Sequence, residues 1–172
     1  VEISQLVASI ATRSKFVVAD DFVRLDGHVN AVCRQLESQL LMRMFADEHK
    51  EDLDVQHKAS YNNKAYTSHG VKYDQGHTRG SGEGGTSALN TILNAMMKFD
   101  AIARQMRALG PADYDQVWQL LNMYVIVGGD DGITGDIYAE HLRVAAREMG
   151  FKLTSDTLFR GEMGVTFLSR VY

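Results

Sequence analysis

The chain has 172 residues and a net charge of −4, with 45% apolar and 23% charged residues. This composition fits one globular domain with a single packed core and suggests neither a disordered nor a fibrous protein. Its one cysteine, Cys33, excludes an internal disulfide framework, and no apolar run reaches the about 18 residues that could span a bilayer. The negative charge alone does not favour a nucleic-acid surface, although a site for divalent cations would itself concentrate acidic residues.

The first predicted elements are a strand and a helix. Residues 16–19 form an apolar run with β-branched side chains, which predicts a buried strand that ends at Asp20 and Asp21. After Gly27, apolar residues recur at steps of three and four, which predicts a helix. Its expected buried face consists of Val29, Val32, Cys33, Leu36, Leu40 and Met44. Cys33 is therefore expected to be a buried structural thiol.

The middle of the chain contains a polar insert and two predicted helices. Residues 47–80 are polar and have little periodicity, which predicts an inserted, partly irregular segment. A glycine-rich loop at 81–85 is followed by a long predicted helix, Thr86 to Met106, which Gly110 and Pro111 stop. The apolar side of this helix is made of Leu89, Ile92, Leu93, Met96, Phe99, Ala103 and Met106. The next helix carries Val117, Leu120 and Leu121.

The last part of the chain predicts a hairpin, a helix and two strands. Residues 123–127 predict a strand, 128–132 a tight turn and 133–134 the start of a return strand. A helix follows, and then strands at 151–153 and in the strand-like run 165–172. The apolar positions of that helix are Tyr138, Leu142, Ala145 and Met149. The whole order predicts an α+β fold with helices on one face of a small antiparallel sheet, compatible with a split βαβ, ferredoxin-like core.

The tip of the predicted hairpin has the sequence GGDDG, in which Asp130 and Asp131 are adjacent. Two neighbouring carboxylates repel each other unless they are solvated or bridged by a cation. Oxygen ligands at this spacing suit a hard ion such as Mg²⁺, and the flanking glycines permit positive φ and the close approach of a ligand. A solvated turn without function explains the sequence equally well, because Asp-Gly is a common turn pair.

A third carboxylate, Asp21, follows the first predicted strand. An antiparallel sheet can bring Asp21 beside Asp130 and Asp131, which together would form the clamp for a two-metal phosphoryl transfer. The alternative is a solvated strand end in which Asp20 or Asp26 caps the next helix. Taken alone, this segment favours the alternative.

The glycine-rich loop also admits two interpretations. Gly80, Gly82 and Gly85 fit the dinucleotide-binding pattern GxGxxG. However, the preceding residues 73–79 are polar and predict no buried strand, and no acidic residue ends a second strand at the expected distance. A P-loop does not fit either, because no lysine follows the last glycine.

In this order, the three segments resemble the palm of RNA-dependent RNA polymerases of positive-strand RNA viruses. Asp21 with Asp26 matches motif A of that family, and the hairpin tip, with Asp130 and Asp131 after a glycine, matches motif C. The resemblance covers residues 15–172. The sequence around the glycine-rich loop is similar to that of nodavirus-like and related polymerases.

The glycine-rich loop and two later segments match further motifs of the same family. Motif B, with the spacing SGxxxTxxxN, is matched by Ser81, Gly82, Thr86 and Asn90. Residues 150–153, which contain Lys152, resemble motif D. Residues 167–170, which end at Arg170, resemble the primer grip of motif E.

The resemblance implies template-directed RNA synthesis, in which ribonucleotides are transferred to an RNA 3′-hydroxyl by a two-metal mechanism. Asp21, Asp130 and Asp131 would be catalytic and would ligate two Mg²⁺ ions, for which Mn²⁺ could substitute. Lys152 would protonate the leaving pyrophosphate, and Arg170 would contact the primer; a solvated lysine and an ordinary surface arginine are the alternatives. The residues that would bind the nucleotide and its ribose 2′-hydroxyl are Asp26, Ser81, Gly82, Thr86 and Asn90.

The resemblance also implies how the chain is divided and what it needs. Residues 1–46 would be palm with motif A, 47–80 a fingers-type insert, and 81–172 palm with motifs B to E. The basic segment that grips the triphosphate in this family precedes motif A, and residues 1–14 are too short to contain it. We therefore expect a fragment of a larger replicase, inactive alone, that needs its fingers and thumb. Its expected partners are RNA template, primer or nascent strand, and ribonucleoside triphosphates, in the host cytoplasm.

Two other functions would share parts of this pattern. A reverse transcriptase would share the palm, but its motif C usually has an aromatic residue before one variable position and the two aspartates. This chain has Val127, Gly128 and Gly129 there. Asp26 also favours ribonucleotides, because reverse transcriptases commonly place a bulky aromatic residue there. A non-catalytic palm-like module that binds RNA or protein is disfavoured because clustered carboxylates repel without a metal.

Overall fold

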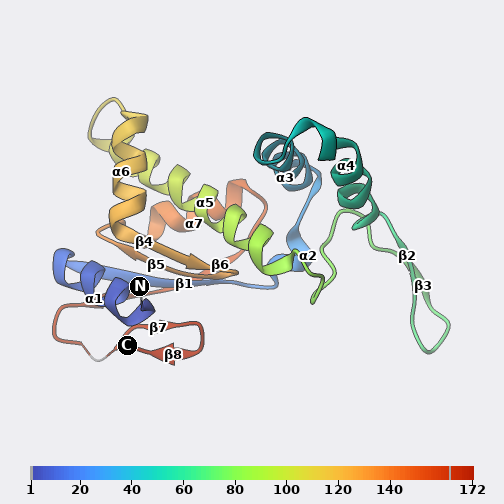
Figure 1. Cartoon of the computed structure of the whole chain (residues 1–172). Helices are drawn as coiled ribbons and strands as arrows, with labels where there is room; N and C mark the ends of the chain where they lie inside the picture. The colour runs from blue at the N-terminus through green and yellow to red at the C-terminus, as the bar shows by residue number, and fades with distance from the viewer. Residues whose placement is uncertain (1, 163) are drawn as a thin grey trace.

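A four-stranded antiparallel sheet forms the centre of the computed structural model, which describes residues 2–162 and 164–172 (Figure 1). The strand order is β4-β5-β1-β6. The strands are β1 Phe16–Phe22, β4 Val125–Gly128, β5 Asp131–Gly135 and β6 Leu153–Phe159. The first strand is thus central and lies between two strands from late in the chain. This is the strand order of a split βαβ, ferredoxin-like core, as the sequence predicted.

Three helices cover one face of this sheet. They are α5 Thr86–Leu109, α6 Tyr114–Tyr124 and α7 Ala139–Glu148. Side chains alternate along β1, so that Val18 and Phe22 enter the core beneath these helices while Val17 enters a second core on the opposite face. Leu93, Met97 and Leu142 of the helices are fully buried against the first face. The α+β fold is therefore confirmed.

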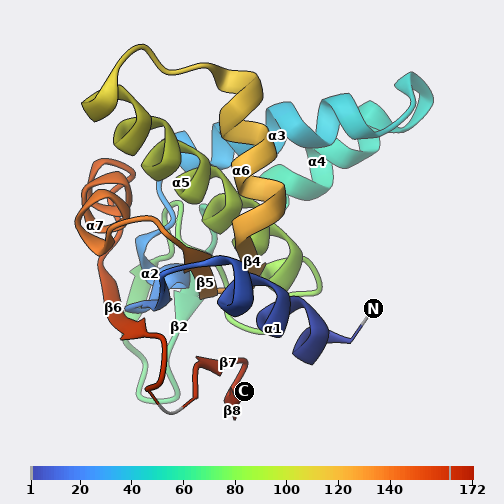
Figure 2. The same ribbon diagram turned by 90° about the vertical axis from the view of Figure 1, so that its left-hand side faces the viewer.

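The opposite face of the sheet is also covered, which the sequence did not predict. Helix α1, Ile3–Arg13, and the two-stranded hairpin of β7, Thr166–Phe167, and β8, Arg170–Val171, pack there (Figures 1 and 2). The prediction of helices on one face only was therefore incomplete. The core on this side is small, and it joins Val7, Ile10, Val17, Ile133, Val165 and Phe167.

Residues 25–74 form an arm that extends away from the sheet (Figure 1). Its helices are α2 Leu25–His28, α3 Ala31–Met44, the 3-10 helix η1 Asp47–His49, and α4 Lys50–Ala59, followed by the hairpin of β2 Lys64–Tyr66 and β3 Lys72–Asp74. The segment 47–80 is thus more regular than predicted. It contains helix α4 and a hairpin although it lacks an apolar stripe. Helix α4 packs against α3 around buried polar side chains instead of apolar ones.

The predicted buried face of α3 was wrong in part. Cys33 is buried as expected, but Val32 and Met44 are 64% and 66% exposed. Arg34 and Glu37 are buried in their place, which is tolerated because they form an ion pair with each other and hydrogen bonds with other buried groups. Apolar periodicity therefore identified only part of the buried side of this helix.

The predicted buried face of α5 was also wrong in part. Leu93 and Ala103 are buried as expected, but Met96 is 39% exposed. The buried face instead includes three polar side chains at intervals of four residues, Asn90, Asn94 and Lys98. Each has a polar partner on another element, so the helix is rotated relative to its apolar pattern.

Several element boundaries differ from the predicted ones for local reasons. The predicted strand 123–127 begins only at Val125, since α6 continues through Tyr124, and the strand predicted at 151–153 begins at Leu153 and extends to Phe159. The strand-like run 165–172 is a short hairpin that turns at Leu168 and Ser169, which both have positive φ. None of the described helices combines the length and the apolar character that crossing a membrane requires.

Candidate active site

The structure brings the three predicted catalytic carboxylates together at one end of the sheet. The antiparallel register pairs Asp20 with Gly132, so that the next residues of the two strands, Asp21 and Asp131, lie opposite each other. The hairpin of β4 and β5 pairs Gly128 with Asp131, which leaves Asp130 at the tip. Sheet pairing therefore gathers carboxylates that lie more than a hundred residues apart in the sequence.

The pKa of Asp21 is affected by the nearby carboxylates. Partial burial and then the negative charges of Asp130 and Asp131 raise the pKa of Asp21 above its ordinary value. Asp21 and Asp130 are both exposed, so the site is open to solvent on this side. The contributions of Asp130 and Asp131 to this pKa shift reflect carboxylates that are close enough to repel one another.

Asp131 is held more firmly than the other two. Its Oδ2 accepts a hydrogen bond of 2.9 Å from the backbone N–H of Leu168, in the turn between β7 and β8. Burial and the charge of Asp130 raise the pKa of Asp131, and the Leu168 hydrogen bond opposes this shift. The C-terminal hairpin is thereby tied to the carboxylate cluster.

The donor set of this cluster suits a hard cation. It consists of carboxylate oxygens only, and a cation between them would offset the burial and the mutual repulsion that together raise the pKa of Asp21. Within the described residues, no three His, Cys, Asp or Glu side chains are already gathered around one metal-sized point. Because Asp21 and Asp130 are exposed, their carboxylates can rotate toward a shared ion.

Helix α5 braces the hairpin tip through two side chains. Asn94 Nδ2 lies 3.3, 3.2 and 3.0 Å from the backbone oxygens of Gly129, Asp130 and Asp131. One turn earlier, Thr91 Oγ1 accepts a 2.8 Å hydrogen bond from the N–H of Gly129. Asn94 was missed by sequence reasoning. The signal that could have found it is the polar repeat at 90, 94 and 98 within an otherwise apolar helix face.

A buried ion pair lies beneath the start of β5. Lys98 of α5 and Asp20 of β1 are joined by a hydrogen bond, and both side chains are 0% exposed. Burial raises the pKa of Asp20 although Lys98 opposes this, and burial lowers the pKa of Lys98 although Asp20 opposes it. A Cβ at Gly132 would lie 2.7 Å from Lys98 Nζ and 2.9 Å from Asp20 Oδ1, so this position leaves no room for a side chain.

Two of the predicted ribose-recognition residues meet directly. Asn90 Nδ2 donates a 2.8 Å hydrogen bond to Asp26 Oδ1, which links α5 to the segment after β1. Thr86 Oγ1 donates to the backbone oxygen of Gly80 at 3.1 Å and so closes the glycine-rich loop onto the helix. Ser81 and Gly82 lie exposed in that loop, and Gly82 has a φ of +89° that favours glycine.

The other two predicted site residues are not brought into contact with the carboxylates. Lys152, between α7 and β6, is exposed, and its ammonium group forms no hydrogen bond with the described residues. Arg170, on β8, is likewise exposed, and its guanidinium has no hydrogen-bond partner in the described part of the chain. Their predicted roles therefore stay predictions.

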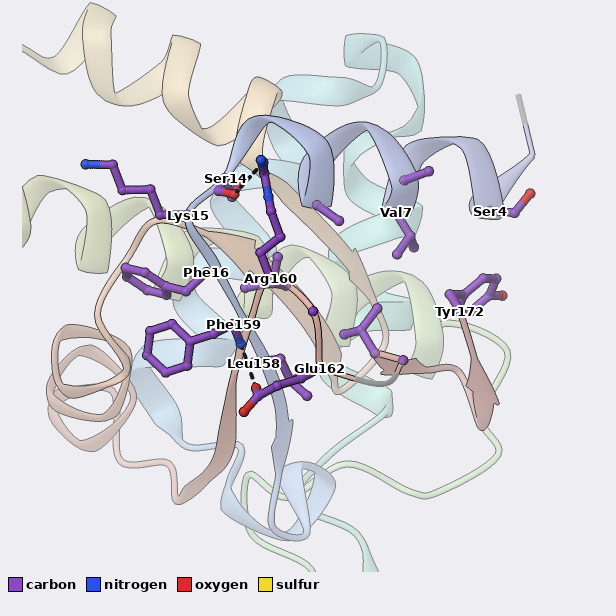
Figure 3. A pocket seen from close by; sticks show the side chains of 16 residues that line it. Ser4, Val7, Ser14, Lys15, Phe16, Leu158, Phe159, Arg160, Glu162 and Tyr172 are labelled. Carbon is purple, nitrogen blue, oxygen red and sulfur yellow. Dashed lines mark hydrogen bonds between the residues drawn. The ribbon is translucent and has the colours of Figure 1, made fainter.

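A separate cavity of about 360 Å³ lies on the α1 side of the sheet (Figure 3). It is bounded by α1, the start of β1, the end of β6 and the C-terminal segment. Its lining includes Val7, Phe16, Leu158, Phe159 and Val165. No predicted catalytic or ribose-binding residue lines it, so it is not the site described above.

The known proteins that this chain resembles share one name. No sequence profile of a known protein family matches the chain. Over 99% of its length, the chain is 31% identical to the RNA-directed RNA polymerase of Greasy grouper nervous necrosis virus and 32% identical to that of Striped jack nervous necrosis virus. It is 26% identical over 91% of its length to the RNA-directed RNA polymerase of Black beetle virus. The chain spans 15% to 17% of the length of these relatives.

Solved structures show the same relationship at the level of the fold. The crystal structure of the RNA-dependent RNA polymerase of a human picorbirnavirus matches 98% of this chain with a TM-score of 0.72 and 21% sequence identity, over 30% of its own length. Its insertion-loop deletion mutant matches with a TM-score of 0.73. The predicted resemblance to nodavirus polymerases is confirmed. The chain is thus a homologue of one segment of the viral RNA-directed RNA polymerases, and it has the fold that such a segment adopts.

Proposed function

We propose that this chain is the catalytic palm of an RNA-dependent RNA polymerase and works as part of a larger viral replicase. The observation that carries the proposal is the convergence of Asp21, Asp130 and Asp131 at the tip of the hairpin, in a homologue of proteins named RNA-directed RNA polymerase. The reaction would transfer a ribonucleotide to an RNA 3′-hydroxyl and release pyrophosphate. It would take place in the host cytoplasm.

The carboxylates would hold two Mg²⁺ ions, with Asp21 and Asp130 as the principal ligands. When bound, two such ions activate the attacking 3′-hydroxyl and neutralise charge on the leaving pyrophosphate; Mn²⁺ could substitute. Asp131 would hold less closely, because one of its oxygens already accepts the Leu168 N–H. Asn94 and Thr91 would keep the tip in place, since they bind its backbone and do not occupy the carboxylates of Asp130 and Asp131.

The Asp26–Asn90 pair would recognise the ribose 2′-hydroxyl. A hydroxyl both donates and accepts hydrogen bonds, so it can pair with a carboxylate and an amide at once. The Asp26 side chain is 24% exposed, which leaves it accessible to a nucleotide. Ser81, Gly82 and Thr86 would shape the adjoining loop.

The remaining parts of the proposal concern exposed residues and the layout of the chain. Lys152 would act as a general acid toward pyrophosphate, and Arg170 would contact the primer; both side chains are exposed and form no hydrogen bond with the described residues. Residues 1–46 and 81–172 would be palm and 47–80 a fingers-type insert. The full protein would supply further fingers, a thumb and the grip on RNA and triphosphate.

The proposed function can be tested with the full-length protein that contains this chain. We expect it to extend an RNA primer on an RNA template with ribonucleoside triphosphates, to stop when EDTA removes divalent cations, and to resume when Mg²⁺ or Mn²⁺ is restored. Synthesis of DNA in preference to RNA would instead indicate a reverse transcriptase. Binding of RNA without any incorporation would indicate a non-catalytic module and contradict the proposal.

The brace of the hairpin tip gives a more specific prediction. Asn94→Ala should lower the rate of nucleotide incorporation by about 10- to 100-fold, because small displacements of catalytic groups have effects of this size. The folded state should persist, as judged by circular dichroism. Met96→Ala, on the exposed side of the same helix, is the matched control and should retain the wild-type rate. Equal rates in both variants would show that the tip holds its position without Asn94.

A further inference from the structure

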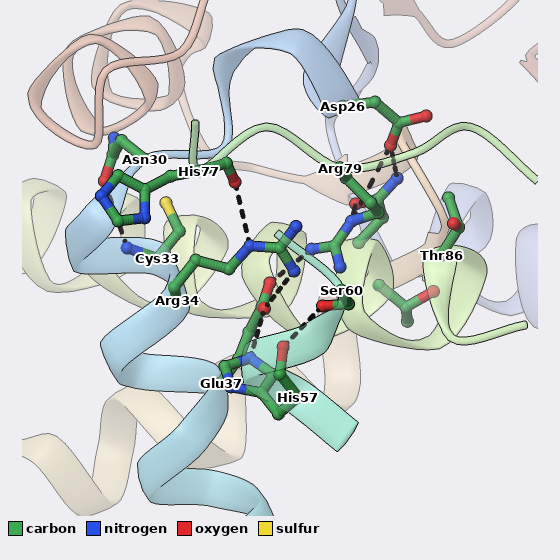
Figure 4. Close-up of polar contacts among 12 residues, drawn as sticks. Asp26, Asn30, Cys33, Arg34, Glu37, His57, Ser60, His77, Arg79 and Thr86 are labelled. Carbon is green, nitrogen blue, oxygen red and sulfur yellow. Dashed lines mark hydrogen bonds and ion pairs between the residues drawn. The ribbon is translucent and has the colours of Figure 1, made fainter. Parts of the chain in front are cut away.

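A buried cluster of charged residues joins the Asp26–Asn90 pair through Arg79. Figure 4 shows it between α3, α4 and the segment that carries Arg79. Its centre is Glu37 of α3, whose side chain is 0% exposed. Glu37 accepts hydrogen bonds from Arg34 at 3.1 Å and from Arg79, and lies 3.1 Å from His57 Nε2. Burial alone would raise the pKa of Glu37, but these partners outweigh it and lower the pKa. Glu37 is therefore held as a carboxylate.

Arg79 connects this cluster to the predicted ribose site. Its Nε donates a 2.9 Å hydrogen bond to Asn90 Oδ1, while its terminal Nη2 binds Glu37. Its own backbone N–H donates to the backbone oxygen of Asp26 at 2.9 Å. Arg79, whose side chain is 1% exposed, thus contacts Glu37, Asn90 and Asp26.

This contact determines which way the Asn90 amide faces. An amide has one acceptor and one donor end, and a guanidinium can only donate. Because Arg79 occupies the acceptor end of Asn90, the NH₂ end must face Asp26, where the 2.8 Å hydrogen bond is found. Rotating the amide would place its NH₂ against the guanidinium and its oxygen against the Asp26 carboxylate. Arg79 therefore fixes the pattern of donors and acceptors that the ribose would meet.

We propose that Arg79 and Glu37 are positioning residues for ribose selection, Arg79 by orienting the Asn90 amide and Glu37 by anchoring Arg79. The inference rests on the proposed function and deepens it. Glu37 is needed because a buried guanidinium requires a counter-charge and a fixed geometry to aim its Nε. Helix α3 thereby contributes to nucleotide discrimination through Glu37, although Glu37 would not itself contact the nucleotide.

A purely structural role for the same cluster makes a different prediction. Arg34 also binds Glu37, and it donates to the backbone oxygens of His77 and Thr78. These bonds tie α3 to the loop before the glycine-rich segment. If Arg79 only did the same, its replacement would lower stability and leave the preference for ribonucleotides over 2′-deoxyribonucleotides unchanged. The ratio of kcat/KM values for the two nucleotides therefore separates the two roles.

The test uses the full-length protein and that ratio. Arg79→Lys keeps the positive charge that Glu37 needs, but an ammonium group lacks the fork that reaches Glu37 and Asn90 together. We expect the preference for the ribonucleotide to fall about tenfold, as for the loss of one oriented hydrogen bond. Glu37→Gln should lower it in the same direction. Asn90→Ala, which removes the proposed selector itself, sets the full size of the effect.

Arg34→Lys is the matched control, because it perturbs the same cluster without touching Asn90, and its ratio should stay at the wild-type value. A wild-type ratio in Arg79→Lys and Glu37→Gln beside a lowered one in Asn90→Ala would overturn the positioning role and leave the proposed function standing. Should Arg79→Lys fail to fold, Glu37→Gln decides the question by the same ratio. A wild-type protein that incorporates no nucleotide would overturn the proposed function and this inference together.

Discussion

Replacing Asp130 with alanine is expected to lower nucleotide incorporation by the full-length protein about a thousandfold or more while leaving the fold intact. Asp130 is exposed at the hairpin tip, so its removal should change the free energy of unfolding by only about 0.5 kcal/mol. Its removal should affect the reaction rate far more, because Asp130 is proposed to be a metal ligand. Metal stabilisation of a transition state is worth several kcal/mol, and about 1.4 kcal/mol corresponds to a tenfold change in rate.

Primer extension with a radiolabelled or fluorescent RNA measures this effect, and urea denaturation verifies the fold. Glu140→Ala is a suitable control, because Glu140 is an exposed acid on α7 whose side chain makes no hydrogen bond with the described residues. It should polymerise like the wild type. Comparable activity of the Asp130 variant and the Glu140 variant would rule out Asp130 as a metal ligand in the reaction.

The second large effect concerns stability. Replacing Lys98 alone with methionine leaves the Asp20 carboxylate buried without its partner, and breaking a buried ion pair in this way costs about 3–5 kcal/mol. Folded domains are stable by about 5–15 kcal/mol, so this change would remove a large share of the total. The free energy of unfolding from urea titration measures it. We expect a lower denaturation midpoint with an unchanged slope.

The double variant Asp20→Asn with Lys98→Met distinguishes the ion pair from the packing of either side chain. Neutral replacement of both partners should recover most of the stability that the single Lys98→Met variant loses, as found generally for buried pairs. The wild type, Lys98→Met, Asp20→Asn and the double variant form a double-mutant cycle. Their free energies of unfolding give the interaction energy between the two side chains. If the double variant were as unstable as the sum of the single ones, the pair would contribute nothing through its charges.

The sequence predicted the elements that depend on local pattern. The apolar run at 16–19 and the GGDDG turn correctly located β1 and the hairpin of β4 and β5. Strand β1, however, continues past Asp20 to Phe22. A buried strand can include Asp20 because Lys98 neutralises it from 78 residues away, and no local pattern contains that partner. The local pattern therefore predicted too short a strand, because the contact that allows β1 to continue comes from the tertiary structure.

The same limitation explains the buried faces that were predicted wrongly. Periodicity counts apolar residues, so it could not find Glu37, Asn90, Asn94 and Lys98 on buried faces. Each is buried because a partner satisfies it, and those partners are on other elements. In contrast, the candidate site was predicted from motif order, since Asp21 and Asp130 share no local signal. The structure adds Arg79, Glu37 and Asn94, which no single motif pointed to.

The central position of β1 has a consequence for how this protein is made. Strand β1 is complete at Phe22, yet its neighbours β5 and β6 begin only at Asp131 and Leu153. During synthesis the innermost strand of the sheet therefore waits, with both edges unpaired, for more than a hundred further residues. Pairing over such separations folds slowly and exposes strand edges meanwhile. The sheet is incomplete until β6 has been made. A nascent or truncated chain that ends before Leu153 should therefore be prone to aggregate and should need chaperones.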